Sequence, residues 1–427
     1  MLSPVLLGGG GFGEATCGIL YLAGFLRRHG VEAFVRLYDG DETDDEVART
    51  MAGLVAFVRP RLVGISLKWY HHLPRALLLA RTLRKLDPGL RIVVGGNTAA
   101  YFWRDLVAEP CVDDVVLGDG EQPLLSLCRG EAHPPNCATR APDGTPTRAP
   151  FGYVQGASNN EVFYSHFDEI FLSEADRHSF SGWVAPGKGC AASCLYCGGG
   201  RGTLWASFGR ARPFLRPVAS VRRDHGEIAP DVWQLRYDFA QGTAAFLSRA
   251  WAGLDLTRHS ATYFLWGAPP RALLKLLSRT FRRVYLVLDV GCFSERQRAL
   301  LTRRGLLKPC PSDAQLLAAV DACRRHANLE LELSGITGLP FTSDRALEEE
   351  ALGVERLLGL GCAVSHQRLE AQPGALVTEH AERFGMTAEA RTYAEFLAWF
   401  ARHGSAPGGP VPMVRFADRA LELKVDA

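Results

Sequence analysis

The chain has 427 residues, of which 47% are apolar and 22% are charged, so it can bury a large core, and extensive disorder is excluded. Its 48 basic and 46 acidic side chains leave a net charge of +2, which argues against a nucleic-acid or membrane-surface partner. No stretch of about 18 apolar residues occurs, and the N-terminus lacks the basic segment of a signal peptide, so we expect a cytoplasmic protein that does not contact a membrane.

Residues 1–130 alternate short apolar runs with longer amphipathic segments. Strands separated by helices of this length pair in parallel through right-handed crossovers. The segment therefore predicts a first domain with a doubly wound, flavodoxin-like parallel sheet. The five predicted strands cover residues 4–9, 32–39, 62–67, 91–96 and 113–120.

Small residues follow four of these predicted strands at their carboxyl ends. Ligands of open α/β sheets bind beyond that edge, and loops without bulky side chains leave room for a large, flat or phosphate-bearing ligand. The alternative is that the glycines only serve tight strand–helix turns. The candidate ligand residues are Gly9, Gly10, Gly11, Phe12, Ser66, Lys68, Gly95, Gly96, Asn97, Gly118, Asp119 and Gly120.

The remainder of the chain divides into three parts. Residues 131–180 are rich in proline and glycine and are predicted to form a linker and an irregular segment. Residues 181–380 show six strand–helix units, too few for an eightfold barrel, and predict a partial, TIM-like (β/α)6 barrel. Residues 381–427 form a short extension that contains an amphipathic helix at 392–404. The predicted fold class is α/β.

Three cysteines, Cys190, Cys194 and Cys197, lie directly after the first strand of this second half. A disulfide is improbable in a reducing compartment, and three cysteines leave one unpaired. A structural zinc site requires four ligands, and no fourth ligand lies close in the sequence. An iron–sulfur cluster usually takes four thiolates, so three would leave one iron open to a substrate or cofactor.

The sequence CAASCLYC at 190–197 resembles the CxxxCx(aromatic)C motif of the radical S-adenosylmethionine enzymes, with Tyr196 at the aromatic position. The resemblance implies a 4Fe–4S cluster held by the three cysteines. It also implies that S-adenosylmethionine chelates the fourth iron, and that an external donor of the flavodoxin or ferredoxin type reduces the cluster.

Other segments of the second half are similar to the same family. Residues 287–305 resemble the segment of its fourth strand, where Asp289 or Ser294 would face the adenosyl ribose. Residues 335–350 and 372–386 resemble its fifth-strand turn, which contains Gly338, and its sixth-strand segment. Asp238 would contact the methionine part of S-adenosylmethionine, although Phe239 stands where a second acid is usual. Arg368, which shares a strand face with Glu370, is a further candidate contact.

The first domain resembles the cobalamin-binding domain that many of these enzymes carry. Such domains often have a D-x-H-x-x-G sequence in the first strand–helix loop, whose histidine binds cobalt. Here that loop reads GGGGFGEATCG and has neither the aspartate nor the histidine. Members of the fused subgroup also bind cobalamin without this ligand, so the resemblance still implies cobalamin as a cofactor.

Together the two resemblances imply a cobalamin-dependent radical enzyme that methylates an unactivated carbon of a small-molecule substrate, as in specialised metabolism. A 5′-deoxyadenosyl radical would remove the hydrogen atom, and cobalamin would deliver the methyl group. One alternative keeps the radical step without methylation, as a rearrangement, ring contraction, cyclisation or epimerisation beside a vestigial cobalamin domain. Another is a non-catalytic metal-binding or cofactor-binding protein on the same fold.

Overall fold

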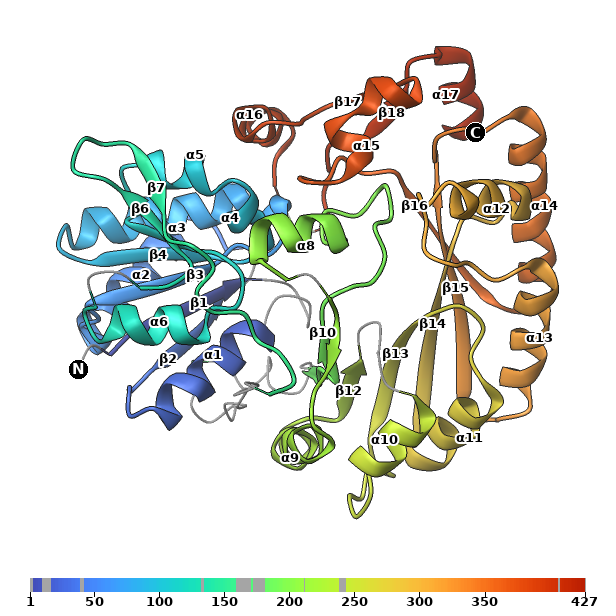
Figure 1. The fold of residues 1–427 in the computed structure, drawn as a ribbon, viewed down its shortest axis with the longest axis horizontal. Helices are drawn as coiled ribbons and strands as arrows, with labels where there is room; N and C mark the ends of the chain where they lie inside the picture. The colour runs from blue at the N-terminus through green and yellow to red at the C-terminus, as the bar shows by residue number, and fades with distance from the viewer. Residues whose placement is uncertain are drawn as a thin grey trace. The chain divides into compact units, whose positions relative to one another are not determined.

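A computed structural model describes residues 3–9, 17–38, 42–131, 134–158, 170–171, 181–210, 212–237, 243–405 and 408–426. The chain divides into two compact units (Figure 1). The first unit comprises Met1–Phe180, Gly202–Ala211 and Thr392–Val411, and the second comprises Ser181–Arg201, Arg212–Arg391 and Pro412–Ala427. Two segments from later in the chain therefore fold with the N-terminal residues.

The first unit is built on an eight-stranded sheet with the order β7-β6-β5-β4-β3-β1-β2-β8. Strands β1 to β5 pair in parallel in the flavodoxin-like order 2-1-3-4-5. Helices α1 and α6 cover one face of the sheet and α3, α4 and α5 the other (Figure 1). Because both faces are covered, the central strands are continuous runs of buried aliphatic residues.

The bounds of the first unit's elements follow the chain from β1 to α16. They are β1 Val5–Gly9, α1 Cys17–Arg28, β2 Phe34–Tyr38, α2 Asp44–Val58, β3 Leu62–Ser66, the 3-10 turn η1 Tyr70–His72, α3 Leu73–Leu86, β4 Arg91–Gly95, α4 Asn97–Tyr101, α5 Trp103–Ala108, β5 Asp114–Val116, α6 Glu121–Cys128, β6 Cys137–Arg140, β7 Pro146–Arg148, β8 Ile170–Phe171, α8 Arg201–Phe208 and α16 Tyr393–His403.

The segment predicted as a linker contains more structure than its composition suggested. Strands β6 and β7 form an antiparallel hairpin that extends the sheet from β5. The turn is closed by one backbone hydrogen bond, from the N–H of Ala141 to the carbonyl of Thr145, and the Asp143 carboxylate caps it by accepting from the N–H of Thr145 at 2.9 Å. The proline and glycine content that indicated a linker belongs to this turn and to the flanks of the hairpin.

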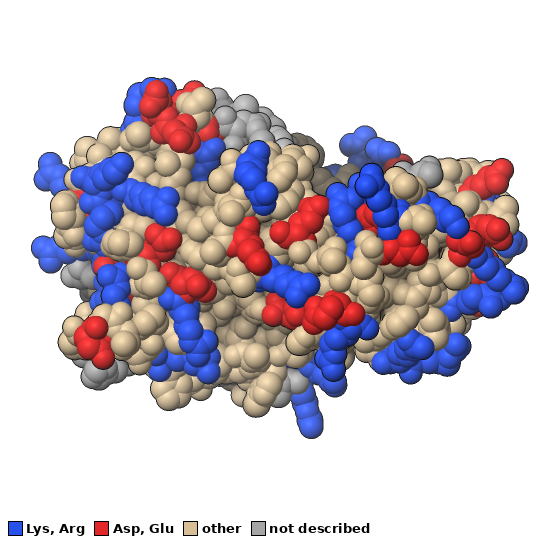
Figure 2. Space-filling view, turned by 90° about the horizontal axis from the view of Figure 1, so that it is seen from above, with Lys and Arg blue, Asp and Glu red and all other residues tan. Residues whose placement is uncertain are grey.

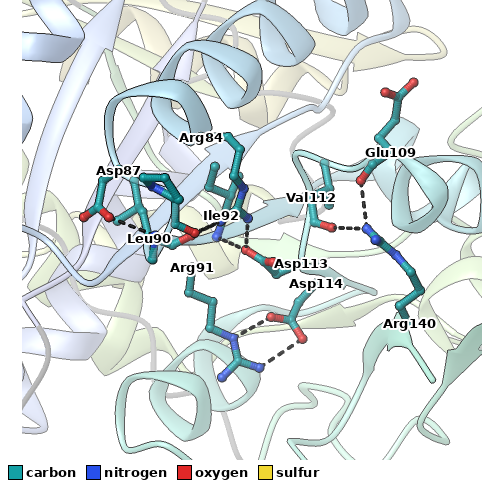
Figure 3. A network of polar contacts seen from close by, with 12 residues as sticks. Arg84, Asp87, Leu90, Arg91, Ile92, Glu109, Val112, Asp113, Asp114 and Arg140 are labelled. Atoms are coloured by element: carbon teal, nitrogen blue, oxygen red, sulfur yellow. Dashed lines mark hydrogen bonds and ion pairs between the residues drawn. The ribbon is translucent and has the colours of Figure 1, made fainter. Parts of the chain in front are cut away.

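Arginine–aspartate ion pairs link β4 to β5 at the end of the sheet where these two strands begin (Figure 3). Arg91 grips the buried carboxylate of Asp114 through two hydrogen bonds of 2.6 and 3.1 Å. Arg84 pairs with Asp113 at 2.5 Å, and the Asp113 carboxylate also accepts from the Ile92 N–H at 2.7 Å. This network lies at the edge opposite to the ligand edge of such sheets, so we interpret it as structural.

The second unit is built on a six-stranded, wholly parallel sheet with the order β16-β15-β14-β13-β12-β9. Helices α10 to α14 line its outer face (Figure 1). This arrangement confirms the predicted α/β fold with a partial barrel. The remaining small strands form two antiparallel pairs, β10 with β11 and β17 with β18.

The bounds of the second unit's elements run from β9 to α17. They are β9 Ser181–Trp183, β10 Gly187–Lys188, β11 Phe214–Leu215, α9 Val218–Ile228, η3 Ala229–Asp231, β12 Gln234–Tyr237, α10 Ala244–Ala250, β13 Ser260–Trp266, α11 Arg271–Thr280, β14 Arg283–Gly291, α12 Glu295–Arg303, α13 Asp313–Arg324, β15 Leu329–Thr337, α14 Asp344–Gly359, β16 Ala363–Arg368, α15 Leu376–Glu379, η4 Ala381–Phe384, β17 Met386–Ala388, β18 Val414–Phe416 and α17 Arg419–Asp426.

A hydrogen-bonded network centred on one buried histidine lies on the outer side of β12. His225 of α9 is fully buried, and its Nδ1 donates to the Val221 carbonyl at 2.7 Å. Its Nε2 therefore accepts, from the Tyr237 hydroxyl and the Trp251 indole, both at 2.8 Å. Burial lowers the pKa of His225 to about 4, so the ring is neutral near pH 7.

Charge is evenly distributed over the surface in view. Figure 2 shows basic and acidic side chains interspersed with uncharged ones on that face, as the net charge of +2 suggests. Within the described residues, no helix is both long and apolar enough to cross a lipid bilayer.

Candidate active site

The three cysteines lie in one loop that follows β9 and the short strand β10. Cys194 is buried, and Cys190 and Cys197 are half-buried. Each thiol accepts one backbone hydrogen bond. The N–H donors to Cys190, Cys194 and Cys197 are, in that order, Ala192 at 3.4 Å, Lys308 at 3.3 Å and Gly199 at 3.3 Å. Sulfurs that carry thiolate charge in a cluster are stabilised by amide donors of this kind.

Distant parts of the second unit hold this loop in shape. The N–H of Leu195 donates to the carbonyl of Leu306 at 2.8 Å, and the carbonyl of Leu195 accepts from Val377 at 3.0 Å. The loop is closed locally by a 2.8 Å bond from the N–H of Arg201 to the carbonyl of Ala192. Hydrogen bonds therefore hold the loop both at Leu195 and at Arg201.

Burial favours the neutral form of the unligated Cys190 and Cys197 thiols. It raises the pKa of Cys197 to about 11 and also raises that of Cys190. Metal binding must displace these protons, because thiolates are the ligands. Among the residues that the structure describes, no group of three His, Cys, Asp or Glu side chains is placed to hold a single metal ion. A four-iron cluster does not require such convergence, since each cysteine binds a different iron.

A buried lysine connects the cysteine loop to the inner face of the sheet. Lys308, 2% exposed at its side chain, donates through Nζ to an Asp289 carboxylate oxygen at 2.5 Å and to the Tyr196 hydroxyl at 3.2 Å. The same hydroxyl lies 3.4 Å from that oxygen. Burial lowers the pKa of Lys308, but the charge and hydrogen bond of Asp289 together with the charges of Cys194 and Cys310 outweigh this effect, and the pKa is raised. The lysine is therefore a fixed positive charge beside the cysteines.

The other residues predicted to contact S-adenosylmethionine lie in different surroundings. Ser294 is buried and caps α12, accepting from the Gln297 N–H at 3.3 Å and donating to Glu349 at 2.8 Å. Gly338 follows β15 with a positive φ of 80°. Arg368 ends β16 two residues after His366, which bonds Glu350 of α14, so Arg368 is on the outer face by alternation. Asp238 lies outside the described residues.

The inner face of the six-stranded sheet carries polar side chains. Glu332 of β15 accepts from the hydroxyls of Tyr285 and Ser365 on the two neighbouring strands. Gln234 of β12 donates to Thr262 of β13 at 2.6 Å. These side chains alternate with fully buried residues that face the covering helices. They are polar groups that the described strands present on the inner face of the sheet.

Arg236 is a cation on this inner face. Its guanidinium lies 4.6 Å from the ring centre of Trp183 on β9 and 4.7 Å from that of Phe264 on β13. Contacts with two aromatic rings hold the guanidinium plane in one orientation. Its N–H edge is therefore suited to bind a carboxylate or phosphate.

The predicted ligand edge of the first unit is partly described. Gly10, Gly11 and Phe12 lie outside the described residues, and Gly9 ends β1. Ser66 and Gly95 end the neighbouring strands β3 and β4 and pair in register, and Asn97 begins α4. Gly96 has a φ of 116°, and a Cβ there would lie 2.6 Å from the Leu67 carbonyl oxygen. Gly96 therefore lets the loops after β3 and β4 pack together. This agrees with the alternative interpretation, in which the glycines only serve tight turns.

The loop after β3 presents buried polar atoms that have no hydrogen-bond partner within the part of the chain that the structure describes. These are Nε1 of Trp69 and Nδ1 of His72. Burial lowers the pKa of His72 to about 3, so its ring is neutral, and Lys68 lies 5.1 Å from the Trp69 ring centre. An unpaired buried polar atom is costly unless a ligand satisfies it. This part of the edge therefore fits a ligand with many amide groups, such as a corrin.

The loop after β5 is used differently. The Asp119 carboxylate is buried and accepts from the guanidinium of Arg210 and from the N–H of Gln155 at 2.8 Å. Gly118 lies against Phe208, and Gly120 lies against Leu22. Side chains of the protein itself occupy the space that these glycines leave.

Two residues that sequence reasoning did not select are Lys308 and Arg210. Lys308 stands alone in the apolar stretch LLKPCP, and an isolated lysine between apolar residues and prolines is a signal that could have marked it. Arg210 lies in a segment without periodicity, and only the fold reveals its partner.

Known proteins resemble this chain in its first domain and in its fold. Residues 6–127 match the model of the B12 binding domain. The radical S-adenosylmethionine methyltransferase TsrM from Kitasatospora setae, solved with tryptophan substrate and an aza analogue of S-adenosylmethionine, superposes with a TM-score of 0.72 at 16% identity, over 98% of this chain and 86% of TsrM. TsrM with cobalamin and a [4Fe-4S] cluster bound gives 0.69 at 15% identity, over 98% and 84%.

A second enzyme shares the arrangement. The cobalamin-dependent S-adenosylmethionine radical enzyme OxsB, with aqua-cobalamin bound, superposes with a TM-score of 0.61 at 14% identity, over 85% of this chain and 53% of OxsB. No curated protein sequence matches the chain.

The chain therefore has the fold of the cobalamin-dependent radical S-adenosylmethionine enzymes over nearly its whole length, with a B12-binding domain at residues 6–127. The resemblance predicted from the cysteine motif and the glycine-rich loops is confirmed at this level.

Proposed function

We propose that this protein is a cobalamin-dependent radical S-adenosylmethionine enzyme that methylates an unactivated carbon of a small-molecule substrate. One observation carries the proposal. Three thiols, each with its own backbone N–H donor, lie in a single loop after the first strand of a six-stranded parallel sheet. That sheet shares a chain with a B12-binding domain.

The residues of the chain have distinct roles in this proposal. When bound, the cluster supplies the electron that cleaves S-adenosylmethionine, and cobalamin supplies the methyl group. Cys190, Cys194 and Cys197 would hold the cluster through three thiolates, which would leave one iron without a protein ligand and able to bind S-adenosylmethionine. Lys308 adds a fixed positive charge beside the thiolates, through its ion pair with Asp289.

The inner face of the sheet would hold the substrate. Arg236, oriented by Trp183 and Phe264, would bind an anionic group of the substrate. Glu332, fixed by two hydroxyl donors, would accept a hydrogen bond from a substrate N–H or O–H. Methyl transfer to a small molecule is supported by the likeness to TsrM, a methyltransferase solved with tryptophan as its substrate.

The test follows a labelled methyl group. The protein is purified without oxygen, supplied with hydroxocobalamin, and incubated with S-adenosylmethionine that carries a deuterated methyl group and a low-potential flavodoxin system. Small aromatic compounds and amino acids, L-tryptophan first, serve as substrates. We expect the label in cobalamin and in a methylated product, and in neither with a variant that has alanine at all three cysteines.

Two other outcomes would redirect the proposal. Release of 5′-deoxyadenosine with an altered but unlabelled product would replace methylation by a rearrangement, cyclisation or epimerisation. Absence of both label transfer and S-adenosylmethionine cleavage in the iron-loaded protein would leave a non-catalytic cofactor-binding protein.

A further inference from the structure

Two surface segments of the second unit lie against one buried residue of the cysteine loop. Leu195, next to Cys194, is fully buried. Its N–H donates to the carbonyl of Leu306 at 2.8 Å, and its carbonyl accepts from the N–H of Val377 at 3.0 Å. Leu306 follows the end of α12, and Val377 is the second residue of α15 (Figure 1). The ends of two helices thus lie over the peptide that follows Cys194.

The path from this surface to a sulfur of the loop is short. Arg304, at the end of α12, is exposed. The N–H of Lys308, four residues further on, donates to Sγ of Cys194 at 3.3 Å. Four residues of chain span at most about 15 Å, so the backbone at Arg304 lies within that distance of the backbone at Lys308. An electron carrier bound here would come close to the cysteine loop.

Exposed arginines and exposed apolar side chains share this surface. Phe341 and Leu376 are 38% and 37% exposed. The guanidinium of Arg304 lies 4.2 Å from the ring centre of Phe341, and that ring lies 6.0 Å from the ring of Phe384. We call this surface the docking face and define it by five residues, Arg303, Arg304, Phe341, Leu376 and Arg383.

Phe341 is held at the surface in a strained conformation. Its φ is 62°, in the left-handed region that a bulky residue seldom adopts. The turn that carries it is tied to α12 by Gln297, a buried side chain that donates to the carbonyls of Leu339 and Pro340 at 3.0 and 3.2 Å. The ring therefore keeps a fixed place beside the arginines of α12. Strained residues cluster at functional sites, and aromatic and arginine side chains are enriched in protein interfaces.

The three arginines of the docking face are not neutralised. None of them forms an ion pair with a residue that the structure describes. Two exposed acids nearby in the sequence are paired with other cations, Glu382 with Arg391 at 3.1 Å and Asp344 with Lys424 at 2.7 Å. Positive charge therefore surrounds two exposed apolar side chains. A complementary partner carries acidic side chains around an apolar centre.

We propose that the docking face binds a small acidic electron-transfer protein, which delivers an electron to the cluster. In this step the carrier is oxidised by one electron and the cluster is reduced by one electron, and no covalent bond forms or breaks. The inference rests on the proposed function, in which the reduced cluster cleaves S-adenosylmethionine. It goes beyond that function by assigning a protein partner to a defined surface of the second unit.

The first test measures how fast a reduced flavodoxin reduces the iron-loaded protein, by anaerobic stopped-flow absorption. The variant Arg303→Glu/Arg304→Glu reverses two charges of the docking face. The matched control is Arg324→Glu/Arg325→Glu, because these exposed arginines likewise end a helix, α13, which leads to the start of β15. The cysteine loop instead follows the end of a strand of the same sheet.

We expect R303E/R304E to be reduced about tenfold more slowly than the wild type at low salt, and R324E/R325E within about twofold of it. Added salt should slow the wild type and affect R303E/R304E much less, because salt screens the attraction between the arginines and the acidic carrier. Equal rates in the wild type and R303E/R304E, or equal slowing in the control variant, would overturn the proposal.

A small reductant separates docking from changes at the cluster. Reduced methyl viologen is a cation and does not require the docking face. It should therefore reduce R303E/R304E at least as fast as the wild type. Slower reduction by methyl viologen as well would place the effect of the substitutions at the cluster and would also overturn the proposal.

Replacing Phe341 tests the apolar part of the docking face. Phe341→Gly removes the ring and relieves the backbone, because glycine adopts positive φ without a steric penalty. We expect reduction by flavodoxin to slow about fivefold, with an unfolding temperature that is not lowered. An unchanged rate would remove Phe341 from the docking face.

Binding without electron transfer distinguishes this inference from the proposed function. Oxidised flavodoxin is titrated at low salt, by calorimetry, into the variant that has alanine at all three cysteines. We expect binding that is weakened about tenfold when R303E/R304E is added to that variant. Equal binding with and without R303E/R304E, or no binding, would overturn the docking face. A wild-type protein that holds no iron would contradict the proposed function, and this titration alone would then decide whether the face binds an acidic protein.

Discussion

The backbone N–H of Lys308 donates to Sγ of Cys194 at 3.3 Å, although the two residues lie 114 positions apart in the sequence. The Nζ of the same lysine is 2.5 Å from the Asp289 carboxylate. Lys308 therefore donates a backbone hydrogen bond to a sulfur of the cysteine loop, and its side chain places a positive charge near that loop.

The charge of Lys308 is expected to ease reduction of the cluster. Two unit charges about 8 Å apart, at an effective dielectric constant near 20, have an interaction energy of roughly 2 kcal/mol. In Lys308→Met the reduction potential should fall by on the order of 50–100 mV, since about 59 mV corresponds to a tenfold change for one electron. A redox titration followed by electron paramagnetic resonance measures the shift.

The matched control removes the acid as well. In Lys308→Met with Asp289→Asn, both charges of the pair are gone, so the potential should return part of the way to the wild-type value. A potential in K308M equal to that of the wild type would contradict the electrostatic role of the lysine.

The three cysteines should be required for the cluster, and the neighbouring Cys310 should not. The thiol of Cys310 donates to the Lys308 carbonyl at 3.3 Å, and its pKa is raised to about 11 by burial. Alanine at Cys190, Cys194 or Cys197 should abolish the iron–sulfur absorption, while Cys310→Ala should keep four irons per chain. Loss of the cluster in C310A would make Cys310 a fourth ligand and would close the open iron.

The unpaired nitrogens after β3 should contribute to cobalamin binding. Trp69→Phe and His72→Ala each remove a buried polar atom that has no hydrogen-bond partner among the described residues. Each should weaken binding of hydroxocobalamin about five- to tenfold, because a hydrogen bond contributes about 1 kcal/mol. Titration with the apo protein measures this. His29→Ala serves as control, since His29 bonds Phe25 at the far end of α1. Equal affinities in all variants would remove the loop from the cobalamin site.

Stability should fall at mildly acidic pH because His225 is buried as a neutral ring. The pKa is about 4 in the folded state and about 6.5 in an unfolded chain. The folded state thus binds fewer protons, and its stability is full above about pH 6.5 and lost as the pH falls toward 4. The loss amounts to about 3 kcal/mol.

Urea unfolding of the wild type and of His225→Gln at several pH values isolates this effect. The variant should be less stable near pH 7 but should show a flatter dependence between about pH 6.5 and 4. His72, whose pKa is also lowered, titrates in both proteins and cancels in the difference. Parallel curves for the two proteins would contradict the assignment to His225.

The sequence predicted the fold well because its signals are local. Apolar runs such as Ile92-Val93-Val94 mark buried strands, and capping residues such as Thr43 and Ser312 begin helices as their sequence patterns indicate. The cysteine spacing is equally local. Each of these features depends on residues within a few positions of one another.

Features that depend on pairing between distant segments could not be predicted. The amide of Lys308 reaches Cys194, and Arg210 reaches Asp119, only because the chain folds back on itself. The helix α16 was expected as part of a C-terminal extension, but it folds with the first unit, where Tyr393 donates to Glu109 at 3.0 Å. No periodicity in the sequence encodes such contacts.

The proposed function requires that one chain holds an open iron–sulfur cluster and cobalamin together. The iron, sulfide and cobalt content of the protein is measured after anaerobic purification with cobalamin supplied. We expect four irons, four sulfides and one cobalt per chain, with cobalt retained and iron lost in the variant lacking all three cysteines. Zinc in place of iron, or iron without cobalt, would contradict the proposed function.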